Sequence, residues 1–93
     1  MKKILMFYLD GCPYCRDAMQ AVHELREKDP AYGALEIEMV EETRRRDLSD
    51  AHDYYYVPTL YVGDEKVYEA RPGQRYREIR ANVKRAFDRA LQG

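Results

Sequence analysis

Two cysteines lie three positions apart near the start of the sequence, in the run Cys12-Pro13-Tyr14-Cys15. A Cys-x-x-Cys pair can cycle between a dithiol and a disulfide, because one turn of a helix brings the two sulfurs within bonding reach. Two cysteines are too few for the disulfide framework of a small secreted domain. The spacing therefore predicts a redox-active pair.

The residues alone leave two other interpretations of the pair open. A structural zinc site needs two further ligands, and the remaining candidates, His23 and His52, do not have metal-ligand spacing. The cysteines can also be two unrelated structural residues. Pro13 suits the first turn of a helix and favours the redox interpretation, so we expect no bound metal.

The elements around the pair determine how it works. An apolar run over residues 3–9 is typical of a buried strand, and the Asp10-Gly11 break precedes a helix that begins at Pro13. Cys12 is then expected at the helix N-terminus, where unpaired N–H groups and the helix dipole favour a thiolate. Cys15, one turn inside, is expected to be more buried. This asymmetry predicts that Cys12 attacks a substrate disulfide and that Cys15 resolves the mixed disulfide.

The rest of the chain alternates strand-like and helix-like patterns. After the first helix we expect an edge strand, a weak helix, a hairpin of two strands and a final amphipathic helix, over residues 35–39, 41–53, 59–62 with 66–68, and 76–91. Strands joined through helices imply parallel pairing, whereas the hairpin adds an antiparallel strand. The expected architecture is an α/β, thioredoxin-like fold, β-α-β-α-β-β-α, in which a four-stranded mixed sheet has helices on both faces.

Length and composition limit the range of functions. A chain of 93 residues, of which 45% are hydrophobic, fits a single domain over residues 1–93. A net charge of −1 argues against nucleic-acid binding driven by bulk charge. The longest apolar run, residues 4–9, is too short to span a membrane, and we interpret it as a first strand rather than a signal peptide. We expect a monomeric cytoplasmic protein.

At two places the sequence resembles the glutaredoxin family. Cys12-Pro13-Tyr14-Cys15 is identical to the active-site motif of dithiol glutaredoxins, and Val57-Pro58 lies where that family carries a valine–proline pair with a cis peptide bond. The resemblance implies a thiol–disulfide oxidoreductase that reduces protein disulfides or glutathione mixed disulfides. The site residues that it implies are the catalytic Cys12 and Cys15, the substrate-binding Tyr14, Val57 and Pro58, and the structural Pro13.

Two departures from the family pattern concern glutathione. Many glutaredoxins carry Lys or Arg three residues before the first cysteine, where it contacts a glutathione carboxylate, and here that residue is Leu9. The stretch that holds the other end of glutathione is replaced by residues 69–74, in which Glu69 adds a negative charge. We therefore expect weak glutathione recognition, with Arg71 and Arg75 as candidates to replace the lost contacts.

The resemblance leaves the partners open. Disulfide-containing proteins are the expected substrates, no bound cofactor is expected, and the electron donor is either glutathione, as a co-substrate, or a thioredoxin reductase. A glutathione-dependent iron–sulfur cluster carrier is a second candidate function, which Pro13 disfavours because a proline there accompanies the redox role in the family. A non-catalytic redox-sensing binding module is a third.

Overall fold

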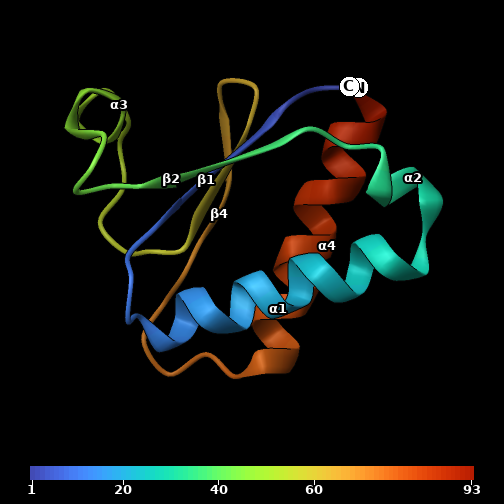
Figure 1. Cartoon of the computed structure of the whole chain (residues 1–93), viewed down its shortest axis with the longest axis horizontal. Helices are drawn as coiled ribbons and strands as arrows, with labels where there is room; N and C mark the ends of the chain where they lie inside the picture. The colour runs from blue at the N-terminus through green and yellow to red at the C-terminus, as the bar shows by residue number, and fades with distance from the viewer.

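The first apolar run forms the strand β1 (Ile4–Tyr8), an inner strand of a four-stranded sheet with the order β2-β1-β3-β4. The computed structural model describes all residues from 1 to 93 (Figure 1). The elements that follow β1 are, in chain order, α1 (Pro13–Lys28), α2 (Pro30–Gly33), β2 (Ile37–Glu41), α3 (Arg46–Asp50), β3 (Thr59–Val62), β4 (Glu65–Glu69) and α4 (Tyr76–Gln92). The predicted order is confirmed, with one short helix, α2, added.

The sheet is mixed, as the connections predict. β1 runs parallel to β2, with Ile4 opposite Ile37, because α1 returns the chain to the same end of the sheet. β1 runs antiparallel to β3, and β3 pairs with β4 across a tight turn in which Gly63 has a φ of 59°. Glycine adopts this left-handed conformation without the steric cost that other residues meet. The thioredoxin-like topology is therefore confirmed.

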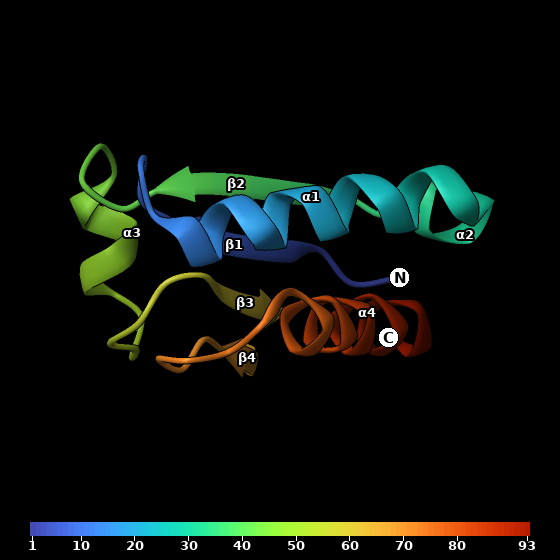
Figure 2. The same ribbon diagram turned by 90° about the horizontal axis from the view of Figure 1, so that it is seen from below.

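Alternating residues of β1 contribute to two cores. Ile4 and Met6 join the main core with residues of α1 and α4, which lie against each other on one face of the sheet (Figure 2). Phe7 belongs to a smaller cluster, where it meets Val40 and the α3 residue Leu48. This alternation is the two-residue period of a strand. Both faces of β1 are covered, which explains why the first run is apolar throughout.

Several element boundaries differ from the sequence prediction, among them β2, which runs over Ile37–Glu41 rather than residues 35–39. After α1, Pro30–Gly33 form the separate α2, at whose N-terminus the Asp29 carboxylate accepts a hydrogen bond from the Ala31 N–H at 2.9 Å. The weak helix expected over residues 41–53 is reduced to α3. Glu41 instead ends β2, where it is buried and accepts hydrogen bonds from Thr43.

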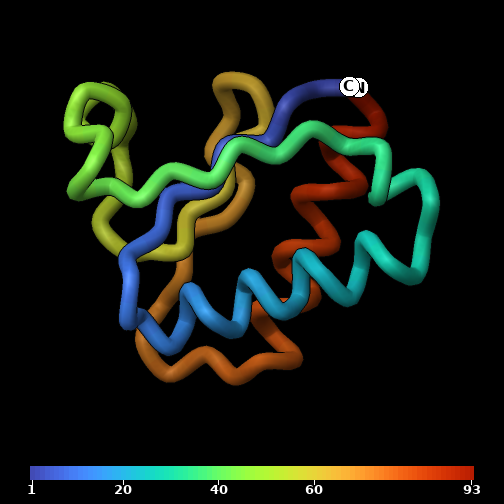
Figure 3. Tube along the Cα trace, in the orientation of Figure 1, coloured from blue at the N-terminus to red at the C-terminus, as the bar shows by residue number.

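The fold brings distant parts of the chain together at two places. Its two ends lie side by side, and the Lys2 N–H donates to the Ala90 carbonyl at 3.0 Å. Away from the termini, the segment that leads into β3 passes beside the start of α1 (Figure 3).

None of the helices combines the length and the apolar character needed to cross a membrane.

Candidate active site

Cys12 is the N-cap residue of α1, in agreement with its predicted place at the helix N-terminus. Its backbone is extended, with φ −82° and ψ 119°, and Pro13 occupies the first turn. The Cys12 Sγ accepts a hydrogen bond from the Cys15 N–H, with 3.3 Å between sulfur and nitrogen. Sulfur thus stands where an oxygen of Ser or Asp caps many helices. This N–H and the dipole of α1 both favour negative charge on the Cys12 sulfur.

Cys15 differs from Cys12 in its exposure. Cys12 is half-exposed, whereas Cys15 has only 1% of its surface exposed. Burial first, and then the neighbouring Cys12 thiol, raise the pKa of the Cys15 thiol to about 12. Both residues are free thiols. The pair therefore consists of one accessible sulfur and one buried, protonated sulfur.

Val57 and Pro58 border Cys12. The peptide bond that joins them is cis, and the Cys12 thiol donates a weak hydrogen bond to the Val57 carbonyl, with 3.8 Å between sulfur and oxygen. The Val57 N–H donates to no acceptor within the protein. Pro58 is buried, and its carbonyl accepts a hydrogen bond from the Ala70 N–H at 3.0 Å. The unpaired backbone N–H of a residue that contacts an accessible sulfur can pair with another chain.

The segment before Val57 is fixed from β4. The Glu69 carboxylate accepts hydrogen bonds from the backbone N–H groups of Tyr55 and Tyr56 at 2.8 and 2.9 Å. The Lys66 ammonium donates to the other oxygen of the same carboxylate at 2.8 Å. Burial alone would raise the pKa of Glu69, but the hydrogen bonds from Lys66, Tyr56 and Tyr55 outweigh it and lower this pKa to about 2.

The negative charge that Glu69 was expected to add has a structural role in this arrangement. Its charge is balanced by Lys66 and used to hold the loop that precedes Val57. No sequence signal pointed to the contact, because Glu69 lies 13 positions from Tyr56 and on a different element. The role of Glu69 in holding the loop before Val57 was therefore not predicted from the sequence.

Tyr14, which lies between the two cysteines, is half-buried rather than exposed. Its ring packs against the main core, and its hydroxyl accepts a hydrogen bond from the Gly73 N–H at 2.6 Å. Gly73 has a φ of 89° in the turn between β4 and α4. The same turn carries Arg71 and Arg75, which are both exposed. Tyr14 therefore ties this turn to the first turn of α1.

A shallow depression of about 250 Å³ opens beside the two cysteines. Leu9 and Met19 give it apolar lining, and the exposed Arg16 adds a positive charge. Asp10, which also lines it, is paired with Arg44 at 2.6 Å. The cysteines thus lie beside apolar and positively charged groups.

Neither histidine has one of the two cysteines as its partner. His23 is exposed on α1 and lies 3.0 Å from the Glu27 carboxylate. The His52 ring packs on Phe7 and Tyr61, with ring centroids 5.0 and 4.7 Å apart. This packing leaves His52 half-buried.

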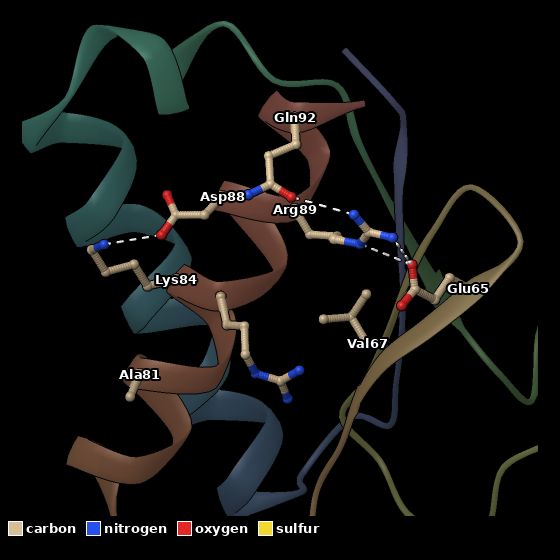
Figure 4. Close-up of a pocket in the computed structure, with 8 residues that line it drawn as sticks. Glu65, Val67, Ala81, Lys84, Asp88, Arg89 and Gln92 are labelled. Atoms are coloured by element: carbon tan, nitrogen blue, oxygen red, sulfur yellow. Dashed lines mark hydrogen bonds and ion pairs between the residues drawn. The ribbon is translucent and has the colours of Figure 1, made fainter.

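A larger depression, of about 480 Å³, lies between β4 and α4 (Figure 4). Four of its charged side chains form two ion pairs, Arg89 with Glu65 at 2.9 Å and Lys84 with Asp88 at 3.0 Å. The fifth, Arg85, donates a hydrogen bond to Asn82 at 2.9 Å. It shares no lining residue with the depression beside the cysteines. It is a solvated ion-pair network, and we assign it no function.

Solved structures with the same arrangement of elements are thioredoxins. A mutant thioredoxin from Halobacterium salinarum NRC-1 matches with a TM-score of 0.57 at 21% identity, over 90% of this chain and 73% of that one. The first two thioredoxin domains of Saccharomyces cerevisiae Eps1p match with a TM-score of 0.59 at 20% identity, over 92% of this chain and 36% of that one. At these identities the likeness establishes the fold alone.

The family follows from the sequence itself. No curated protein sequence matches the chain significantly. The family model described as Glutaredoxin matches residues 4–67, which is more than half of the chain. The matched region includes β1, the cysteine pair, Val57-Pro58 and β3. The chain therefore belongs to the glutaredoxin family.

Proposed function

We propose that the protein is a thiol–disulfide oxidoreductase that reduces protein disulfides or glutathione mixed disulfides through Cys12 and Cys15. The observation that carries the proposal is the environment of the Cys12 sulfur at the N-terminus of α1, with the Cys15 N–H at 3.3 Å and the Val57 carbonyl at 3.8 Å. The helix N-terminus favours the thiolate, which is the nucleophile in thiol–disulfide exchange. The Val57 backbone offers the substrate a place to bind.

In the first step, the Cys12 thiolate attacks one sulfur of the substrate disulfide. A bond forms between Cys12 and the substrate sulfur as the substrate disulfide breaks, and the leaving thiolate takes a proton from water. The substrate backbone pairs with the Val57 N–H in the manner of an added strand. This pairing holds the substrate sulfur next to Cys12.

In the second step, Cys15 resolves the mixed disulfide. The Cys15 thiol loses its proton to water, and its sulfur attacks Cys12. A Cys12–Cys15 disulfide forms, the second substrate thiolate leaves and is protonated, and two electrons have passed from the protein to the substrate. Burial, the main cause of the raised pKa of Cys15, persists in the mixed disulfide, so little Cys15 is ionised at neutral pH and resolution is expected to be slower than attack.

Return to the dithiol needs two electrons from outside, from glutathione as a co-substrate or from a thioredoxin reductase. The apolar Leu9 beside the cysteines supports weak glutathione recognition, so we favour disulfide-containing proteins as substrates. We further propose that the protein acts as a cytoplasmic monomer without a resident cofactor. Comparing the rates at which glutathione and a thioredoxin reductase reduce the oxidised protein, under identical conditions, would identify the electron donor.

Two cysteine variants test the proposed function. Cys12→Ser is expected to abolish disulfide reduction, because no nucleophile remains. Cys15→Ser is expected to react once and to stop at a mixed disulfide, which the mass of the intact protein reveals. Wild-type turnover by Cys12→Ser would refute the assignment.

A further inference from the structure

The chain has nine tyrosines, and two of them are exposed next to the proposed substrate-binding backbone. Tyr55 and Tyr56 have 92% and 52% of their surface exposed, whereas the other seven are buried or half-buried. Their neighbour Tyr54, by contrast, is packed within the protein. Its ring stacks on Phe7, with 4.8 Å between the ring centroids, and its hydroxyl donates a hydrogen bond to Glu42 at 2.6 Å. The packing of the protein thus gives Tyr55 and Tyr56 no such partner for their rings.

The backbone beneath these two rings is held in place. The Glu69 carboxylate accepts both of their N–H groups, and the Thr59 hydroxyl donates to the Tyr56 carbonyl. A tyrosine on a fixed backbone has few rotatable bonds to order when it binds a partner. Large aromatic rings held in this way are efficient contact groups, because they bury much apolar area at a small entropic cost.

The position of the rings indicates what they contact. Tyr56 directly precedes Val57, whose carbonyl oxygen lies 3.8 Å from the Cys12 sulfur and whose N–H is unpaired. A substrate that pairs with Val57 as an extended strand continues past this residue, whereas a small disulfide ends near the sulfur. Residues next to the substrate cysteine therefore come within reach of Tyr55 and Tyr56.

We propose that Tyr55 and Tyr56 form a binding surface for apolar residues that flank the disulfide of an extended polypeptide substrate. This inference rests on the proposed function and adds a substrate preference to it. Glu69 acts as a positioning residue, because it holds the surface in line with Val57. The expected preference is for polypeptide disulfides with apolar flanks over polypeptide disulfides with small polar flanks.

The test uses two peptides, each with one cysteine blocked as a mixed disulfide with 2-mercaptoethanol. One carries Phe and Leu beside the cysteine, the other Gly and Ser, and bis(2-hydroxyethyl) disulfide serves as a substrate without flanks. The reduced wild-type protein is expected to react roughly tenfold faster with the apolar peptide than with the polar one, equivalent to about 1.4 kcal/mol. The Tyr55→Ser, Tyr56→Ser double variant is expected to bring the two peptides within twofold of each other.

The controls separate this surface from the reaction itself. The double variant should react with bis(2-hydroxyethyl) disulfide at the wild-type rate, because Cys12 is unchanged. Met39→Ser removes an exposed apolar side chain from β2, at the far edge of the sheet, and should keep the full preference. Equal wild-type rates with both peptides, or a preference that is retained in the double variant, would refute the proposed binding surface but not the proposed function. Failure of the wild type to reduce any of the three disulfides would overturn the proposed function and this inference together.

Discussion

The hydroxyl of Tyr14 accepts a hydrogen bond from the backbone N–H of Gly73 at 2.6 Å. The two residues are 59 positions apart in sequence. The bond joins the first turn of α1, which Cys12 caps, to the turn that precedes α4. A residue between the two cysteines thus stabilises the N-terminal end of the helix that Cys12 caps and that contains Cys15.

Loss of this bond is expected to lower the stability of the protein. Tyr14→Phe keeps the ring in the core and removes the hydroxyl, so the free energy of unfolding should fall by about 0.5–1.5 kcal/mol in urea denaturation. Tyr8→Phe is the matched control, because Tyr8 is also half-buried and its hydroxyl has no hydrogen bond in the protein. Equal effects of the two substitutions would contradict the role given to Tyr14.

Glu69→Gln is expected to destabilise the protein in a pH-dependent way. The folded-state pKa of Glu69 is lowered to about 2. Its ionised carboxylate therefore stabilises the fold at pH values above the ordinary glutamate pKa, and this stabilisation is lost as the pH falls toward 2. The variant should be less stable than the wild type at pH 7, by about 1–2 kcal/mol from the weakened charge-assisted hydrogen bonds. The difference should shrink as the pH approaches 2.

Glu65→Gln is the control for that experiment. Glu65 begins the strand that Glu69 ends, but its side chain is about half exposed and its partner is Arg89 on the surface. Exposed ion pairs contribute little, so this variant should stay within about 0.5 kcal/mol of the wild type. A difference between Glu69→Gln and the wild type that does not change with pH would argue against the charge of Glu69 as the cause.

The two cysteines are expected to differ in their reaction with iodoacetamide. Burial raises the pKa of Cys15 to about 12, so this thiol remains protonated and inaccessible at pH 7.5. The native, reduced protein should gain one adduct, at Cys12, within the time in which the urea-unfolded protein gains two. Peptide mapping by mass spectrometry identifies the modified residue. Equal modification of both cysteines in the native state would be inconsistent with the proposed roles.

Leu9→Lys is expected to increase the turnover of glutathione mixed disulfides. Leu9 lines the depression beside the cysteines, so a lysine at this position can offer a charged partner to a glutathione carboxylate. One charge-assisted hydrogen bond is worth roughly 1.5–3 kcal/mol, so kcat/KM should rise about tenfold or more. Leu9→Met keeps the apolar character and should leave kcat/KM unchanged. An unchanged rate with Leu9→Lys would mean that other residues, such as Arg71, already bind the carboxylate.

Local sequence patterns were sufficient for the strands and for the cysteine pair. The apolar run of β1 and the proline that starts α1 act within a few residues of one another, so their effect can be predicted without the fold. The motif resemblance added Val57-Pro58, which local patterns alone do not connect to the cysteines. The helix predicted over residues 41–53 forms only over Arg46–Asp50, and its predicted first residue, Glu41, instead pairs with β1 as the last residue of β2.

Contacts between distant side chains were not predictable in this way. Glu69 has the same local neighbours whether it faces solvent or the N–H groups of Tyr55 and Tyr56. Tyr14 likewise fits an exposed position at the start of a helix as well as a half-buried one. Only the placement of β4 against the loop, and of the following turn against α1, determines which of these occurs.

The open sheet has two edge strands, and charged side chains occupy both edges. Lys3 pairs with Glu38 beside β2 at 2.6 Å, and Glu65 and Lys66 lie on β4. Charges on edge strands hinder the edge-to-edge pairing between copies that leads to aggregation. The protein can therefore offer the unpaired Val57 N–H to other chains while its own sheet resists unwanted association, which should keep it dispersed at high concentrations.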